Sequence, residues 1–292
     1  MLCPVCKHTE YSKLLTVKDF TVSTENFELV ECASCGFRYT AHPPAPDQIG
    51  RYYQSDAYIS HTDSKKGIFN TIYQLIRKQA VASKRKLVTH HSHCNKGQLL
   101  DYGCGTGAFL MEMKSAGWQV QGMEPDPGAA SRAAELTAST ISHPDHLSSL
   151  PSNAFNVVTM WHVLEHVHDL HGTLDQVKRI LKQDGILVLA VPNHTSYDAR
   201  HYAEHWAAYD VPRHLYHFSP EAVRSLSNRN GFSLASVRPM WYDAFYIALL
   251  SHQHQQGSSR WLRSFLVGLN SNLKTMKQTD RGSSLVYVMR PN

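Results

Sequence analysis

Four of the six cysteines in this sequence form two Cys-x-x-Cys pairs near its start: Cys3, Cys6, Cys32 and Cys35. In each pair, a tight turn can direct two thiolates at one tetrahedral metal ion, and four thiolates leave no open position for a substrate. We therefore expect a structural zinc site in a small ribbon over residues 1–42. Disulfides are the alternative, but no apolar signal segment precedes Cys3, so a reducing cytoplasm is expected, where structural disulfides are rare.

A glycine-rich loop is the second pattern that can carry chemistry. Residues 98–107 read QLLDYGCGTG, which places Asp101 two residues before the first of three glycines, Gly103, Gly105 and Gly107. Glycines at the turn from a strand into a helix let the backbone approach a ligand closely. The spacing also satisfies the dinucleotide fingerprint, so an NAD-dependent oxidoreductase is an alternative interpretation.

Acidic residues near this loop distinguish between the two ligands. A carboxylate at Asp101 would repel a pyrophosphate, but it would attract the cationic α-amino group of S-adenosylmethionine. Glu124 ends the next apolar run and can accept hydrogen bonds from both hydroxyls of a ribose. We therefore expect S-adenosylmethionine as the cofactor, and NAD is disfavoured.

These residues need a scaffold that brings the ends of several strands together. From Gln98 onward, short apolar runs alternate with amphipathic segments, which is typical of a mostly parallel sheet with helices on both faces. The seven expected strands are 98–102, 119–124, 139–143, 155–161, 185–191, 232–238 and 284–290. The predicted fold is a doubly wound, Rossmann-like α/β sheet, in which ligands bind beyond the carboxyl ends of the strands.

Composition divides the chain into three parts. A proline-rich stretch opens a linker region, 43–97, whose helical spacing from Ile68 to His90 predicts a helix that docks on the next domain. Residues 98–292 then form the cofactor-binding domain, with a helical insertion at about 240–283. We expect the large apolar residues of this insertion to pack in the core, and a lid, a dimer face or a surface for a membrane-borne acceptor is the alternative.

From about Gln98 to the C-terminus, the sequence resembles the class I S-adenosylmethionine-dependent methyltransferases. The segment from Asp101 to Gly107 is similar to their first motif, and Glu124 to their ribose-binding acid. The block at 206–219 is similar to one in a bacterial subgroup that often carries an N-terminal zinc-binding segment. The resemblance implies cofactor contacts from the following residues: Asp101, Gly103, Cys104, Gly105, Gly107, Glu124, Pro125, Asp145, His146 and His162. Of these, Asp145 and His146 would flank the adenine.

His162 directly follows the run 155–161, at a strand end where an acceptor would approach. Methyl transfer to a hydroxyl or an acidic carbon needs a base with a pKa near the working pH, and histidine meets that need. We expect His162 to be either this base or a ring that packs against the cofactor. Glu165 and His166 come next, and we expect them to cap and pack the start of a helix.

A second group of candidate catalytic residues lies in the sequence RHLYH at 213–217. Arg213 can hold an acidic substrate while His214 or His217 accepts a proton, because functional loops of α/β folds often lie at this place. A buried, hydrogen-bonded turn that organises the edge of the sheet is the alternative.

Charge and hydropathy limit the class of acceptor. The net charge of +5 is concentrated in residues 260–292, which hold six basic residues against Asp280 alone. This tail can face a phosphate-bearing substrate or an anionic membrane, or it can simply be solvated. No apolar run reaches the roughly 18 to 20 residues of a membrane span. The ribbon carries four basic and five acidic residues, and this balance disfavours nucleic acid.

The expected function is methyl transfer from S-adenosylmethionine to a small-molecule, sugar-like or lipid-linked acceptor, with peripheral membrane contact as an option. An RNA methyltransferase with a zinc ribbon is the main alternative. A scaffold that binds the cofactor without turnover is another.

Overall fold

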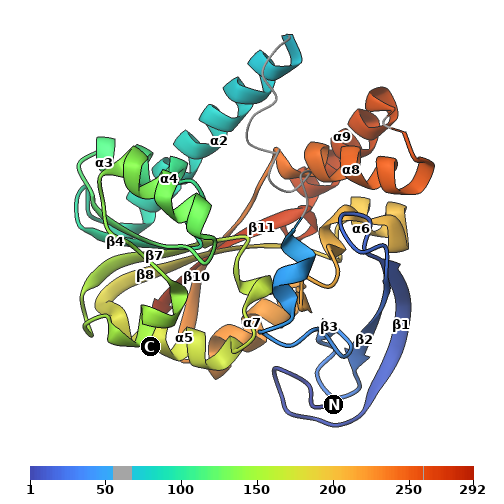
Figure 1. The fold of residues 1–292 in the computed structure, drawn as a ribbon, viewed down its shortest axis with the longest axis horizontal. Coiled ribbons are helices and arrows are strands. Elements are labelled where there is room, and N and C mark those ends of the chain that lie inside the picture. The colour runs from blue at the N-terminus through green and yellow to red at the C-terminus, as the bar shows by residue number, and fades with distance from the viewer. Residues whose placement is uncertain (55–67, 259) are drawn as a thin grey trace.

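A central sheet of seven strands organises most of the chain, with the order β10-β11-β8-β7-β4-β5-β6 (Figure 1). The computed structural model describes residues 1–54, 68–258 and 260–292, and within helix α2 the side chains from Arg77 onward. Strands β4 to β8 run parallel, and β11 lies antiparallel between β8 and β10. The strands are β4 (Gln98–Tyr102), β5 (Gln119–Met123), β6 (Ile141–Ser142), β7 (Phe155–Trp161), β8 (Leu181–Pro192), β10 (Phe232–Pro239) and β11 (Ser284–Pro291).

This sheet confirms the predicted doubly wound α/β fold. Each expected strand is present, although β6 has only two residues and β8 begins four residues early, at Leu181. Leu181 pairs with Phe155, and a register shift follows before Ile186 pairs with Val157. The strand therefore begins before Gly185, the residue at which the expected apolar run starts. The helices are α2 (Ile68–Ser92), α3 (Ala108–Ser115), α4 (Pro127–Thr137), α5 (Leu170–Ile180), α6 (Tyr197–Tyr202), α7 (Pro220–Arg229), α8 (Asp243–Gln256) and α9 (Trp261–Lys277).

Alternate side chains of the central strands face two apolar layers, because successive residues of a strand point to opposite sides. In β4, Leu99 belongs to the same buried cluster as Phe109 of α3 and Val88 of α2. Its neighbour Leu100 belongs to the cluster that contains Leu174 of α5. Helix α2 therefore contributes to the apolar layer on one face of the sheet. The helix was predicted from the helical spacing between Ile68 and His90, and part of that pattern has side chains outside the described residues, namely Ile68, Ile72, Leu75 and Ile76.

The N-terminal segment forms a second, antiparallel sheet that includes a strand from the larger domain. Its strands are β1 (Tyr11–Lys18), β2 (Asn26–Cys32), β3 (Arg38–Thr40) and β9 (Tyr216–His217), in that order. Arg38 pairs with His217, and Tyr39 pairs with Tyr216. Strand β9 thus adds a fourth strand to the sheet of the ribbon, and Figure 1 shows the ribbon beside α6.

Two helices, α8 and α9, fill the segment between β10 and β11. Small residues allow them to approach closely: a Cβ built on Gly268 would lie 2.8 Å from the Phe245 ring. The buried positions of α9 are all small, namely Ser264, Gly268, Ser271 and Thr275. Within the described part of the chain, no helix combines the length and the hydropathy that a membrane crossing requires.

Candidate functional site

The register of the central sheet places Asp101 between two other strands at their carboxyl ends. Asp101 lies opposite Gly122 of β5 and Thr159 of β7. The Thr159 hydroxyl donates a hydrogen bond of 2.6 Å to Asp101 Oδ1, and Asp101 is 2% exposed. Burial raises the pKa of Asp101 to about 7, although this hydrogen bond and the charge of Lys84 act in the opposite direction. This carboxyl group is therefore poised to ionise when a cation binds beside it.

The glycine loop that follows β4 is held in shape by backbone hydrogen bonds. The N–H groups of Gly103 and Cys104 donate to the Met123 carbonyl at 2.7 and 2.9 Å. Gly105 and Gly107 have φ angles of +53° and +82°, which favour glycine. A Cβ on Gly105 would enter open space, whereas one on Gly107 would press against α4. The loop therefore leaves room above Gly105, as a closely approaching ligand requires.

Glu124 is fixed by the same loop. Its Oε2 accepts a 2.8 Å hydrogen bond from the Gly105 N–H, and its Oε1 accepts one of 3.0 Å from the Asp126 N–H. Each carboxylate oxygen can accept a further hydrogen bond. Asp101 and Glu124 thus end adjacent parallel strands, with the glycine loop between them.

The remaining predicted cofactor residues lie in this loop or after β5 and β6. Cys104 is buried, and its sulfur would lie 2.7 Å from a Cβ on Gly122, so it fills the space beside β5. Asp145 and His146 lie in a 3-10 turn, η2 (Pro144–Ser149), after β6, and both are exposed. Their contact with an adenine stays a prediction, as does a contact of Pro125 with the cofactor.

A lysine that the sequence analysis missed also faces this region. Lys84 of α2 places its Nζ 4.4 Å from the centre of the Trp161 ring, and its charge interacts with Asp243 and Asp101. Burial lowers the pKa of Lys84. The available signal was helical spacing, because Lys84 lies one turn before the buried Val88.

His162 lies between two carboxylates. Its φ angle of +58° is unusual for a residue other than glycine, and it turns the chain directly after β7. The ring nitrogens lie 3.0 Å from Asp243 Oδ2 and 3.4 Å from Glu165 Oε1. Burial lowers the pKa of His162, but these two acids outweigh it and raise that pKa to about 9. This pKa favours the charged ring at neutral pH. The general base and its alternative, a ring that packs against the cofactor, both stay predictions.

Arg213 and His217 are structural rather than catalytic. Each guanidinium nitrogen of Arg213 donates within the protein, to Asp210, to the Tyr52 carbonyl or to Asp19. With 1% of the residue exposed, the predicted contact with an acidic substrate is wrong. His217 is buried where β3 meets β9, 3.1 Å from the Thr40 hydroxyl. The alternative interpretation, a buried hydrogen-bonded turn, describes both residues.

His214 is also buried, and its Nδ1 lies 2.9 Å from the Ala208 carbonyl oxygen. Its ring packs edge-on against His166, with centroids 4.6 Å apart. Glu165 and His166 do not begin a helix, because α5 starts at Leu170 with Asp169 as its cap. They belong instead to a single 3-10 turn, η3 (Leu164–His166).

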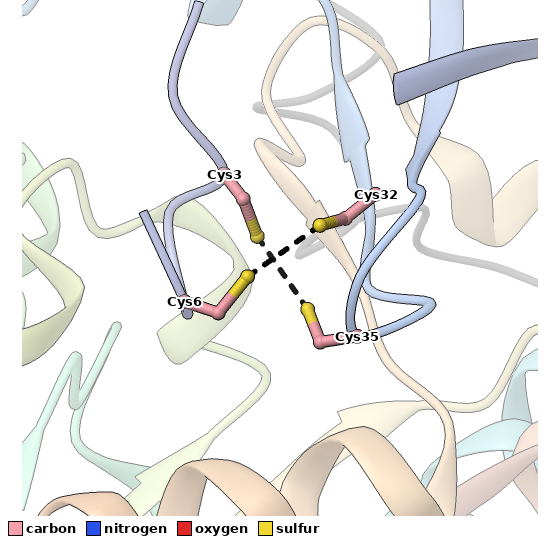
Figure 2. Close-up of side chains that lie close together, drawn as sticks. All are labelled: Cys3, Cys6, Cys32 and Cys35. Carbon is pink, nitrogen blue, oxygen red and sulfur yellow. Dashed lines mark hydrogen bonds between the residues drawn. The ribbon is translucent and has the colours of Figure 1, made fainter. Parts of the chain in front are cut away.

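The four cysteines of the ribbon converge on one point (Figure 2). The sulfurs of Cys3 and Cys35 are 3.6 Å apart, and those of Cys6 and Cys32 are 3.5 Å apart. Tetrahedral ligands at a Zn–S distance of about 2.3 Å would lie about 3.8 Å from one another. The cluster therefore has the composition and nearly the dimensions of a closed thiolate site.

Comparison with known proteins relates this geometry to a family. Residues 73–237, more than half of the chain, match a family model described as a methyltransferase domain. The ubiquinone biosynthesis O-methyltransferase of Actinobacillus pleuropneumoniae serotype 7 is 31% identical over 109 residues, or 34% of this chain and 47% of that protein. The mitochondrial ubiquinone biosynthesis O-methyltransferase of Bos taurus is 27% identical over 168 residues, or 51% of this chain and 44% of that protein. The chain thus spans about half the length of these curated relatives.

Solved structures share the fold at low identity. The magnesium protoporphyrin IX methyltransferase of Synechocystis PCC 6803, with bound SAH, gives a TM-score of 0.54 at 14% identity and covers 82% of this chain and 97% of that one. A SAM-dependent methyltransferase from Thermotoga maritima, a possible histamine N-methyltransferase, gives 0.52 at 18% identity and covers 77% and 97%.

Proposed function

The chain belongs to the methyltransferase-domain family and is a class I S-adenosylmethionine-dependent methyltransferase, and from this premise we propose that its acceptor is a small molecule linked to lipid. The family membership removes the NAD-dependent oxidoreductase as an alternative. The RNA alternative finds no support in the relatives described above. A scaffold without turnover is separated from an enzyme by the experiment below.

The observation that carries the donor side is the buried carboxyl of Asp101 beside the open face of Gly105. Asp101 would hold the cofactor's α-ammonium group, and Glu124 would accept hydrogen bonds from its ribose hydroxyls. S-adenosylmethionine, when bound, supplies a methyl group activated by a sulfonium. The protein then has to position the acceptor in line and exclude water.

His162 is the strongest candidate on the acceptor side. As an imidazolium between Asp243 and Glu165, it can attract an acceptor oxygen through its positive charge, and its side chain is 32% exposed. We propose this orienting role in place of the general base. Asp243 begins α8, so the site includes the helical segment at 240–283.

The lipid-linked acceptor is proposed from the outer face of α9. The large apolar side chains of this helix point outward, and their exposed fractions range from 37% for Leu269 to 73% for Met276. They form one stripe at helical spacing: Trp261, Leu262, Phe265, Leu266, Leu269, Leu273 and Met276. The expected core packing of these residues is therefore wrong, because the small residues of α9 face inward instead.

Basic residues follow the same helix. Arg263, Lys274 and Lys277 are exposed on the side next to the apolar stripe, and α9 carries no acidic residue. An apolar stripe flanked by basic side chains is typical of helices that lie on an anionic membrane surface. The names of the relatives, ubiquinone biosynthesis O-methyltransferases, also favour a lipid-linked acceptor.

We further propose that Cys3, Cys6, Cys32 and Cys35 hold a structural zinc ion. The proposed organisation is the ribbon at 1–42, a linker and docking helix at 43–97, and the catalytic domain at 98–292. Because β9 completes the ribbon sheet, we expect zinc to stabilise the block at 213–217 as well.

The test is transfer of a labelled methyl group by the purified protein into cell extracts that have been separated into lipid, aqueous and RNA fractions. We expect label in the lipid fraction, and we expect Asp101→Asn to reduce it strongly when the cofactor is below saturation. Asp175→Asn, an exposed change on α5, is the matched control and should label normally. Label confined to RNA or to aqueous metabolites would contradict the proposed acceptor. Cofactor binding without label in any fraction would indicate a scaffold.

A further inference from the structure

A second group of metal-binding side chains lies apart from the cysteines, after the carboxyl end of β7. Glu165 and His166 come from η3, and His214 comes from the turn before β9. One ligand atom from each of these residues lies within 4.8 Å of the others. The backbone joins the two segments, since the Leu215 N–H donates to the Glu165 carbonyl at 2.8 Å.

Both histidines are oriented by backbone carbonyls. His214 Nδ1 lies 2.9 Å from the Ala208 carbonyl oxygen, and His166 Nδ1 lies 3.1 Å from the Arg213 carbonyl oxygen and 3.0 Å from the Tyr53 hydroxyl. A carbonyl oxygen only accepts and a hydroxyl can accept, so with Nδ1 as the donor each Nε2 presents a lone pair. Histidines that ligate metals are usually fixed by a carbonyl in this way.

Glu165 supplies a charge that the described residues do not fully compensate. It is 0% exposed, and neither carboxylate oxygen accepts a hydrogen bond from any described residue. The nearest cation is the ring of His162, which lies 3.4 Å from Oε1. This ring also contacts Asp243, so its charge is shared between two carboxylates. A buried carboxylate without hydrogen bonds is unfavourable unless a cation is bound to it.

We propose that Glu165, His166 and His214 bind one divalent first-row transition-metal ion, separate from the ion of the cysteine site. Two imidazoles and one carboxylate suit Zn²⁺, Fe²⁺ or Co²⁺, whereas Mg²⁺ prefers oxygen ligands. Three protein ligands leave at least one coordination position for water or another molecule. The inference does not depend on the identity of the acceptor, because it follows from these three side chains.

The test is metal stoichiometry and Co²⁺ spectroscopy of the full-length protein after loading with Zn²⁺ or Co²⁺ and removal of free metal. We expect two ions per chain. One should show thiolate-to-cobalt charge-transfer bands, and the other only the weaker bands of nitrogen and oxygen ligands. Glu165→Gln and His214→Gln should each remove the second ion and keep the thiolate bands. His90→Gln, an exposed change on α2, should keep both ions.

A wild-type protein that binds one ion, with thiolate bands alone, would overturn the proposal. So would a Glu165→Gln variant that retains two ions, or a second ion that His90→Gln removes. If a variant fails to fold, the cobalt spectrum of the wild type decides the question by itself. Because these readouts do not involve methyl transfer, failure of the metal site and failure of the proposed acceptor are distinguishable.

Discussion

The affinity of the protein for S-adenosylmethionine should rise with pH, because the cofactor's ammonium group needs Asp101 in its ionised form. The pKa of this buried carboxyl is about 7 in the folded protein. Binding near pH 6 must therefore first remove a proton from most molecules. Between about pH 6 and about pH 7.5 we expect an approximately eightfold gain in affinity, or about 1.3 kcal/mol.

Titration calorimetry in two buffers of different ionisation enthalpy measures both the affinity and the proton released on binding. Proton release should approach one per cofactor near pH 6 and decline above pH 7. Asp101→Asn should remove the pH dependence and cost roughly 1.5 to 3 kcal/mol of binding free energy above pH 7. Asp175→Asn should behave like the wild type.

The same carboxyl group should affect the stability of the cofactor-free protein in the opposite sense. Its folded-state pKa lies above the unfolded value of 3.8, so its contribution to stability is complete below about pH 4 and is lost as the pH rises through about 7. The loss is at most about 4 kcal/mol, from about three pKa units. Asp101→Asn should therefore be more stable than the wild type in urea near neutral pH. Wild-type affinity that is flat between pH 6 and pH 7.5, or an Asp101→Asn variant with normal affinity, would refute the reasoning.

Three further changes test other contacts. The two carboxylate oxygens of Glu124 each accept a hydrogen bond from a backbone N–H, and Glu124→Gln replaces one of these oxygens by an NH2 donor. This change should weaken cofactor binding by about 1.5 to 3 kcal/mol in calorimetry. Arg213→Met leaves the buried Asp19 without its cation, so denaturant titration should show a loss of about 3 to 5 kcal/mol in the free energy of unfolding. The double variant Leu266→Glu/Leu273→Glu should sediment less with anionic vesicles than the wild type, while its circular dichroism spectrum stays unchanged. Equal vesicle binding by this variant would exclude the α9 stripe as the membrane-binding surface.

Local patterns were sufficient to predict the sheet and to place Asp101, the glycine loop and Glu124 at the ends of adjacent strands. Each central strand is a short apolar run, and the glycine loop with Asp101 and Glu124 is encoded within 27 residues, 98–124. Such short-range signals survive in the sequence because the strand, the turn and the ligand group are consecutive in the chain.

Contacts between distant segments were not predictable in this way. Asp243 holds His162 across 81 residues, and Asp19 meets Arg213 across 194. No local pattern relates the members of such pairs, so Arg213 looked like a substrate ligand rather than an internal ion pair. The periodicity of α9 predicted a helix, but the assumption that its large apolar residues face inward was wrong. The small residues of α9 face inward instead, because they allow α9 to pack closely against α8.

The pairing of β3 with β9 also sets an order of folding during synthesis. The cysteines and the first three strands of the ribbon leave the ribosome early, but the partner of Tyr39 is Tyr216, which emerges only after most of the central sheet. Until then, the edge of β3 is an unpaired strand edge, the kind of surface that promotes association between nascent chains. A thiolate cluster that closes early would hold this edge in register while the remainder of the chain is made.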